Sequence, residues 1–550
     1  REAMDSHETV SFDIFDTLVT RPLLSPDTAF SIAEIKVKKA LNSPVSFAKF
    51  RKQAEIQSRR KKRLAGDCSI DDIYTEFRNI TGLSEAACES IRQTEIENEI
   101  SLCVPRSDMV EAFLHARSMN KRVFLISDMY LRRLDVERLL SKCGIYGYDE
   151  LMLSCETGRR KDIGELWDCL KAREEGSRWL HIGDNEHSDV SLPMEKGFEA
   201  FHVMSGTNVF SHTAFGKRLL QRFGTTMQPG DSAILGTLVA HIFNSPFALH
   251  SSDGDYRIRD PRSMGYAVFG PIFTAFLTWL IRSTREDGRD ILLFLSREGF
   301  FLEKLYHRML ECFKQQGIDV KRIETRYFLA SRRAASLASL MTEPDILELL
   351  EAPYQGTMSY LADSRFGLSG GTIPCPDELV SLPGDLGRVR KAILSCTDQI
   401  LHRAKAEREG YLQYCSEIGL PSRRGIGIID LGYSGSIQYY LSRIFQRPTA
   451  GYYLVTSDTL RGLRYEGNTM KGCFSYKDHD TGMVSPMYTY ALILEGILTS
   501  PDGQFMGFGR EHDSLKPVFD APGKSQKVFD SLSLIFEGVS DFIGDTVRVH

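Results

Sequence analysis

Short apolar segments that end in polar residues constrain the fold of this chain more than any other feature. In the first part of the chain they predict strands at 10–12, 122–126, 150–153 and 179–182, each followed by residues with helical periodicity. Strands that alternate with helices in this way are typical of a parallel sheet covered by helices on both faces. We therefore predict a doubly wound, Rossmann-like α/β domain.

The length and the spacing of the segments predict more than one domain. A single hydrophobic core stops growing at a chain length of roughly 250 to 300 residues, and this chain has 550 residues. The predicted parts are a core at 1–20 and 121–205, a helical cap inserted at 21–120, a Gly- and Pro-containing linker at 206–231, a second α/β domain at 232–460 and an irregular extension at 461–550. The second domain has predicted strands at 290–295, 325–330, 425–429 and 452–455, and a strand pair is predicted around 504–508 and 515–519.

Composition excludes several classes of protein. Hydrophobic residues make up 42% of the chain, and the formal net charge is -5, so we expect no overall attraction to nucleic acid or anionic membranes. Eleven cysteines without a C-x-x-C pair support neither a disulfide framework nor a zinc knuckle. The start of the chain, 1–10, is polar and predicts no signal peptide in the chain as given. A cytoplasmic location is the resulting prediction.

Two local patterns have alternative interpretations. The uncharged stretch 263–281 is almost long enough to cross a bilayer of about 30 Å, but Pro271 and its small polar residues favour a buried helix. We therefore expect no membrane span. The basic run 59–63 offers charge to a polyanion, and a solvated helix face is the favoured interpretation.

Polar residues gather where the predicted strands of the first domain end. They form F-D-I-F-D-T-L (12–18), S-D-M-Y (127–130), Lys161 and G-D-N-E-H-S-D (183–189). Ligands of open α/β sheets bind at the carboxyl ends of the strands, so these residues are candidates for a site. In order and spacing they resemble the four motifs of the haloacid dehalogenase-like (HAD) superfamily. The resemblance implies a HAD-type parallel sheet with a helical C1 cap, which closes over small substrates.

The same resemblance implies a phosphoryl-transfer site that uses Mg²⁺. Asp13 would be the nucleophile and would form an aspartyl phosphate. The cation would be held by the Asp13 carboxylate, the main-chain carbonyl of Phe15 and Asp184, with Asp189 in support. A metal is needed because a carboxylate and a phosphate repel each other.

Two further residues receive roles from the resemblance. Ser127 would donate a hydrogen bond to a phosphoryl oxygen, and Lys161 would neutralise charge on the phosphoryl group and the nucleophile. The implied substrate is a small phosphorylated metabolite rather than a protein.

One position departs from the HAD phosphatase pattern. The residue two after the nucleophile is usually an acid that protonates the leaving alcohol, and here it is Phe15. This predicts leaving groups that need no proton, as in anhydrides, acyl phosphates and aryl phosphates. Asp16, with Thr17, is predicted to brace the loop. The 2-haloacid dehalogenases also carry an aromatic residue there, but they work without Mg²⁺, and Asp184 argues for a metal.

The second domain shows polar and Gly-rich turns after three predicted strands. A Gly-rich turn between a strand and a helix presents free N–H groups to an anion, and arginines add bidentate contacts. The candidate anion site, for a nucleotide, phosphosugar or phosphate, comprises Ser296, Arg297, Arg332, Arg333, Asp430, Gly432, Gly435 and Ser436. The alternative of equal weight is that the glycines only make turns and the arginines pair with surface carboxylates.

The whole chain resembles two-part HAD proteins of bacterial surface-polysaccharide loci. The resemblance is carried by S-F-D-I-F-D-T-L, L-I-S-D-M-Y-L, H-I-G-D-N, L-S-R-E-G and D-L-G-Y-S-G-S-I-Q. It implies a role in capsule or O-antigen assembly, with polysaccharide-assembly enzymes as partners. Three functions remain open: a Mg²⁺-dependent phosphohydrolase or phosphotransferase, a glycosyl- or phospho-transferase in the second domain with an auxiliary first domain, and a degenerate scaffold.

Overall fold

The chain divides into two compact units. The computed structural model describes residues 2–41, 46–62, 66–173, 176–223, 227–250, 256–368, 373, 376–477, 482–512 and 514–549. The first unit comprises Arg1–Arg259 with Asp545–His550, and the second comprises Asp260–Gly544. Each unit is built on a five-stranded parallel sheet, which confirms the predicted α/β class with a second α/β unit.

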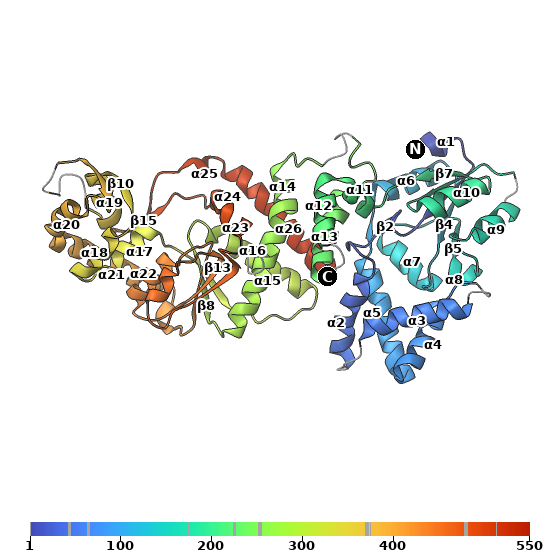
Figure 1. The fold of residues 1–550 in the computed structure, drawn as a ribbon, viewed down its shortest axis with the longest axis horizontal. Helices are drawn as coiled ribbons and strands as arrows, with labels where there is room; N and C mark the ends of the chain where they lie inside the picture. Colours follow the sequence, from blue (N-terminus) through green and yellow to red (C-terminus); the bar gives the residue numbers. More distant parts are fainter. Residues whose placement is uncertain are drawn as a thin grey trace. The chain divides into compact units, whose positions relative to one another are not determined.

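The sheet of the first unit has the order β5-β4-β1-β6-β7, and its strands β4, β5 and β7 are labelled in Figure 1. Its strands are β1 (Thr9–Asp13), β4 (Arg122–Ser127), β5 (Glu150–Leu153), β6 (Trp179–Gly183) and β7 (Glu199–His202). All but β7 were predicted from the sequence. β1 and β6 are buried along their whole length, as expected of strands covered on both faces. The helices and turns around this sheet are α1 (Glu2–Asp5), α6 (Ser107–Ser118), α7 (Arg133–Lys142), α8 (Ser154–Thr157), α9 (Glu165–Arg173), the π-helix η1 (Glu186–Ser191) and α10 (Leu192–Glu195).

A helical insertion separates β1 from β4. It begins and ends at a short antiparallel pair, β2 (Val19–Thr20) and β3 (Val104–Pro105), and contains α2 (Thr28–Leu41), α3 (Phe47–Lys62), α4 (Ile70–Thr81) and α5 (Glu85–Leu102). The predicted insertion extended to residue 120 and so included α6. In the structure α6 packs on the sheet instead, with the Phe113 ring 6.0 Å from that of Phe12 in β1.

The predicted linker at 206–231 is helical in its described part. It forms α11 (Gly206–His212), α12 (Ala214–Phe223) and the start of α13 (Pro229–Ile242), while 224–226 lie outside the described residues. Pro229 occupies the first turn of α13, where its missing N–H costs nothing. Val209, Phe210, Val239 and Phe243 form a buried cluster between α11 and α13, so the segment belongs to the first unit, which continues to Arg259.

The second unit has a parallel sheet of order β14-β13-β12-β8-β9. Its strands are β8 (Ile291–Leu295), β9 (Glu324–Phe328), β12 (Ile426–Asp430), β13 (Ala450–Thr456) and β14 (Thr469–Ser475). The other elements are α16 (Gly299–Gln315), α17 (Arg332–Ala338), α18 (Glu343–Leu350), β10 (Tyr354–Thr357), α19 (Met358–Phe366), β11 (Leu379–Leu382), α20 (Leu386–Leu394), α21 (Thr397–Glu417), η4 (Leu420–Ser422), α22 (Ser436–Phe445) and η5 (Arg461–Arg464).

The region 461–550 is not an irregular extension. β14 completes the sheet, and the predicted strand pair forms the hairpin of β15 (Phe505–Glu511) and β16 (Ser514–Phe519). The remaining helices are α23 (Pro486–Thr489), α24 (Ala491–Ile497), α25 (Lys524–Lys527) and α26 (Phe529–Val549). β14 escaped prediction because it is an edge strand in which Lys471 and Gly472 interrupt the apolar pattern.

One helical stretch of the described chain, Pro261–Glu286, is long and apolar enough to cross a membrane. It comprises α14 (Pro261–Met264), η3 (Gly265–Phe269) and α15 (Gly270–Glu286), and 56% of its most apolar window is buried in the structure. Tyr266 and Phe273 pack on Phe542 and Phe536 of α26, at ring distances of 5.2 and 5.8 Å. The cytoplasmic location and the lack of a membrane span stay predictions.

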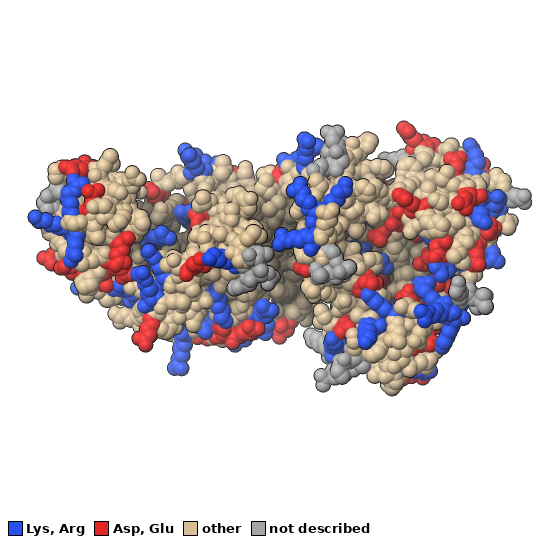
Figure 2. Space-filling view, in the orientation of Figure 1, with Lys and Arg blue, Asp and Glu red and all other residues tan. Residues whose placement is uncertain are grey.

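Figure 2 shows basic side chains gathered over α3, with acidic side chains beside them. The basic run there is largely paired: Arg59 lies 2.7 Å from Asp67, and Lys61 lies 2.6 Å from Glu76. Lys62 also contacts an acid, and Arg63 lies outside the described residues. The paired part of this run therefore has little free charge for a polyanion, as the interpretation as a solvated helix face expects.

Candidate functional site

The connections of the first sheet open a crevice between β1 and β6. From β1 the chain proceeds to β4 and β5 on one side, whereas β6 is followed by β7 on the other. The loops that leave β1 and β6 therefore diverge at the carboxyl edge of the sheet, the usual place for a ligand in such folds. Asp13 ends β1, and Asp184 directly follows β6. Asp189 lies in η1, which Asn185 caps through its side-chain oxygen.

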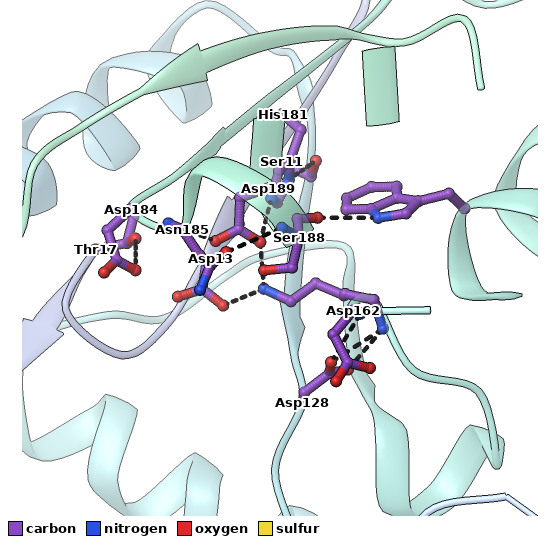
Figure 3. A network of polar contacts seen from close by, with 12 residues as sticks. Ser11, Asp13, Thr17, Asp128, Asp162, His181, Asp184, Asn185, Ser188 and Asp189 are labelled. Atoms are coloured by element: carbon purple, nitrogen blue, oxygen red, sulfur yellow. Dashed lines mark hydrogen bonds and ion pairs between the residues drawn. The ribbon is translucent and has the colours of Figure 1, made fainter. Parts of the chain in front are cut away.

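Three carboxylates meet in this crevice (Figure 3). One oxygen each from Asp13, Asp184 and Asp189 lies within 4.8 Å of the others. Asp13 and Asp189 are only 6% and 1% exposed, so little water screens their repulsion. The resemblance to the HAD motifs implied that these carboxylates lie together, and the parallel strands β1 and β6 deliver their ends to the same edge of the sheet.

Lys161 joins two of these carboxylates. Its Nζ donates to Asp13 Oδ1 at 2.5 Å and to Asp189 Oδ1 at 2.7 Å. Asp128 fixes the loop that carries this lysine. Its carboxylate accepts hydrogen bonds from the main-chain N–H of Lys161 at 2.9 Å and of Asp162 at 3.3 Å.

The charges of the cluster do not balance. Burial raises the pKa of Asp13 well above its usual value, and Asp189 and Asp184 add to that rise while Lys161 opposes it. Burial, with Asp16 and Asp189, raises the pKa of Asp184 to about 7. Burial acts in the same direction on Asp189, but Lys161 and His181 outweigh it and hold that pKa below its usual range. Three carboxylates against one ammonium leave two negative charges, and hard oxygen donors with such an excess fit a divalent cation such as Mg²⁺.

Phe15 lies in the loop after β1, half-buried, with the Arg21 guanidinium 4.4 Å from its ring centroid. A cation over an aromatic face is held by the ring quadrupole. The position two residues after Asp13 thus carries an apolar ring and no acid. The role of the Phe15 carbonyl as a metal ligand stays a prediction.

Asp16 and Thr17 make the bracing contacts that the sequence predicted for this loop. Asp16 has φ 57, and its carboxylate accepts a hydrogen bond from Thr20 Oγ1 at 2.8 Å. The main-chain oxygen of Asp16 also accepts a hydrogen bond from the buried Arg106. Thr17 Oγ1 donates to Asp184 Oδ1 at 3.4 Å, so the loop after β1 is tied to the loop after β6.

Ser127 ends β4, the neighbour of β1, and is buried. The strand register pairs Asp13 with Ile126, so Ser127 lies one residue further toward the carboxyl edge. This position suits a contact with a group bound at Asp13. The hydrogen bond to a phosphoryl oxygen stays a prediction.

A buried chain of hydrogen bonds next to Asp189 was not predicted from the sequence. Trp179 Nε1 donates to Ser11 Oγ at 2.7 Å, and that hydroxyl lies 2.7 Å from His181 Nδ1. Because the indole only donates, the Ser11 hydroxyl is free to donate to Nδ1, which leaves the proton of the imidazole on Nε2, 3.4 Å from Asp189 Oδ1. The signal was present, since Ser11 and His181 are polar residues inside apolar strands.

The candidate anion residues of the second unit fall into two groups. Arg332, Arg333 and Ser436 line one cavity. Ser296 makes a structural contact instead, because its Oγ accepts a hydrogen bond from Ala330 N at 3.1 Å. Arg297 has φ 72 and lies 3.6 Å from Glu298.

The remaining candidates serve the turn after β12. Asp430 is buried, and its carboxylate accepts a hydrogen bond from Leu431 N at 2.8 Å. A Cβ on Gly432 would lie 2.3 Å from the Val455 oxygen, and Gly435 has φ 71 where α22 begins. These two glycines are therefore required by the backbone itself.

Comparisons with known proteins leave the function to be inferred from the site. No model of a known protein family matches the chain. No curated protein matches it in sequence. Among solved structures, the chain is similar to YfnB of Bacillus subtilis, described as a HAD hydrolase and solved bound to magnesium. The two are 16% identical, the match covers 35% of this chain and 87% of that chain, and the TM-score is 0.27.

Proposed function

We propose that the first unit is a Mg²⁺-dependent phosphohydrolase that acts on a small phosphorylated substrate through Asp13. The observation that carries the proposal is the cluster of three carboxylates with Lys161 shared between Asp13 and Asp189. A purely structural ion pair would need one carboxylate for the lysine, and the two extra carboxylates destabilise the fold unless they serve a ligand.

The reaction follows from the groups present. Asp13, Asp184 and Asp189 would hold Mg²⁺, which would supply positive charge that offsets the repulsion between carboxylate and phosphate. A carboxylate oxygen of Asp13 attacks phosphorus, the bond from phosphorus to the leaving oxygen breaks, and an aspartyl phosphate forms. Water then attacks that phosphorus and returns the free carboxylate and inorganic phosphate. Lys161 holds Asp13 in place through both steps.

Phe15 defines the substrate class in this proposal. Its ring can neither give nor take a proton, so the best substrates are those whose leaving group departs as a stable anion, such as acyl and aryl phosphates. The test is steady-state phosphate release from acetyl phosphate and p-nitrophenyl phosphate by the full chain, with Mg²⁺ and with EDTA. Release that needs Mg²⁺ supports the proposal. If no phosphate is released from a broad panel of phosphate esters and anhydrides, the result contradicts the proposal and favours a scaffold without activity.

Replacing Phe15 by Asp is expected to raise kcat/KM for an alkyl phosphate such as a hexose 6-phosphate. A well-placed general acid contributes about 10²- to 10⁴-fold. We expect about 10-fold here, because Arg21 over this position would draw the new carboxylate toward itself. Phe15→Asn is the control, since Asn has about the same size as Asp but cannot act as an acid toward the leaving group. Equal rates for the two variants would show that this position does not face the leaving group.

Mg²⁺ affinity is expected to rise with pH up to about 7, the pKa that burial and the neighbouring carboxylates impose on Asp184. The cation binds the ionised carboxylate, so protons compete below that pH, and Kd should fall about tenfold per unit from pH 5 to 7. The pKa of Asp184 in the folded chain lies above its ordinary value of 3.8. The free energy of unfolding of the metal-free chain should therefore fall as the pH rises from 5 to 7, and bound Mg²⁺ should cancel this loss. Titration calorimetry at several pH values measures this, and a constant Kd would contradict it.

The role in polysaccharide assembly and its partner enzymes stay predictions from the resemblance.

A further inference from the structure

A second crevice lies at the carboxyl edge of the other sheet. The strands β12 and β8 are parallel neighbours, but β8 is followed by β9 on one side and β12 by β13 and β14 on the other. The connections thus switch direction between β8 and β12, which is where open α/β sheets bind ligands.

A cavity of about 720 Å³ opens at this edge. Its lining includes residues that follow three different parallel strands: Arg332 after β9, Tyr433 and Ser436 after β12, and Arg461 after β13. This volume falls within the range of roughly 300 to 1,000 Å³ that is usual for small-molecule sites. The cavity is far larger than one phosphate needs.

The cavity is lined by four arginines, of which two are already engaged. Arg365 donates to the main-chain oxygens of Leu349, Ala352 and Pro353, at 2.7 to 3.1 Å. Arg333 donates to the Met506 oxygen at 2.9 Å. Arg333 and Arg365 therefore have structural roles in the wall of the cavity.

Within the ranges that the structure describes, neither Arg332 nor Arg461 makes a hydrogen bond or an ion pair. Arg332 does lie near enough to the buried Asp430 to oppose the rise that burial causes in its pKa. A planar guanidinium binds phosphate through two parallel N–H groups. Since the two arginines come from separate segments, they suit an anion with more than one phosphate.

The rest of the lining complements such an anion. Ser434 and Ser436 lie beside each other, Oγ to Oγ 3.0 Å, where α22 begins, and no side chain caps that helix. Its first N–H groups and dipole therefore favour negative charge. Tyr433, Tyr440 and Tyr488 also line the cavity, and aromatic side chains of this kind can pack against a planar group.

We propose that this cavity binds a nucleoside diphosphate or the nucleoside diphosphate part of a larger ligand. The phosphates lie against Arg332, Arg461 and the turn before α22, and the base or ribose lies against the tyrosines. The bare anion would satisfy the arginines but leave the aromatic wall without a contact.

Titration calorimetry on the full chain tests the proposal, with UDP, ADP, pyrophosphate and inorganic phosphate as probes. EDTA is present, so metal-dependent binding in the first unit is suppressed. We expect UDP or ADP to bind with a Kd of about 1 to 100 μM. Pyrophosphate should bind at least about tenfold more weakly, because it lacks the ring contacts.

The double variant Arg332→Gln, Arg461→Gln should weaken nucleotide binding about tenfold or more. Neither arginine makes a hydrogen bond or an ion pair with the described residues. The double variant should therefore fold like the wild type, which circular dichroism checks. The control is Arg282→Gln, which removes an exposed arginine from another basic cavity of this unit, beside Arg285 and Arg289. The proposal is overturned if neither nucleotide binds below about 1 mM, if pyrophosphate binds as tightly as the nucleotides, or if the control loses as much affinity as the double variant.

Discussion

Replacing Asp13 by Asn is expected to lower phosphate release from acetyl phosphate by about 10³-fold or more. The amide is nearly isosteric, so the fold and the position of Lys161 should persist. It has no negative charge, however, and is a far poorer nucleophile toward phosphorus. It also removes one of the three carboxylates of the cluster, so Mg²⁺ should bind more weakly. Steady-state release at saturating Mg²⁺ measures the first effect, and calorimetry measures the second.

The matched control for this variant is Asp168→Asn, on α9. The Asp168 side chain is 60% exposed and contacts Lys196, so the same chemical change there should leave activity within about twofold. If Asp13→Asn keeps a tenth or more of the activity, the nucleophile is not Asp13. The second unit would then be the place to look for the catalyst.

Replacing Lys161 by Met is expected to lower the free energy of unfolding of the first unit by about 3 to 5 kcal/mol in EDTA. Met has a similar length but no charge, so Asp13 and Asp189 would be buried beside each other without the ammonium that both now contact. Urea unfolding followed by tryptophan fluorescence reports mainly on this unit, since Trp167 and Trp179 are buried in it. Added Mg²⁺ should restore part of the loss, because it replaces the missing positive charge.

Two further variants separate charge from packing in this prediction. Lys171→Met removes an exposed lysine of α9 and should change stability by less than about 0.5 kcal/mol. The double variant Asp13→Asn, Lys161→Met should be more stable than Lys161→Met alone, because one buried charge is gone. A Lys161→Met chain that unfolds at the same urea concentration as the wild type would show that the carboxylates do not need this cation.

The sequence alone determined the strands of both five-stranded sheets other than the edge strands β7 and β14. Apolar runs such as T-V-S-F in β1 can be buried on both faces only in a covered parallel sheet. Parallel strands bring their carboxyl ends to one edge, and the resemblance to the HAD motifs implied that Asp13, Lys161, Asp184 and Asp189 meet there. Edge strands such as β7 (E-A-F-H) were missed because their exposed side chains carry no apolar pattern.

Only the tertiary structure decided which distant groups meet. Local sequence patterns describe only neighbours in the chain and could not show the role of Asp128, whose partners are the N–H groups of Lys161 and Asp162. In the same way, Gly and Pro at 206–231 suggested a linker, but packing between α11 and α13 makes that segment part of the first unit. The sequence also could not show that Arg332 and Arg461 make no hydrogen bond or ion pair with the described residues, because this depends on where the fold places the carboxylates.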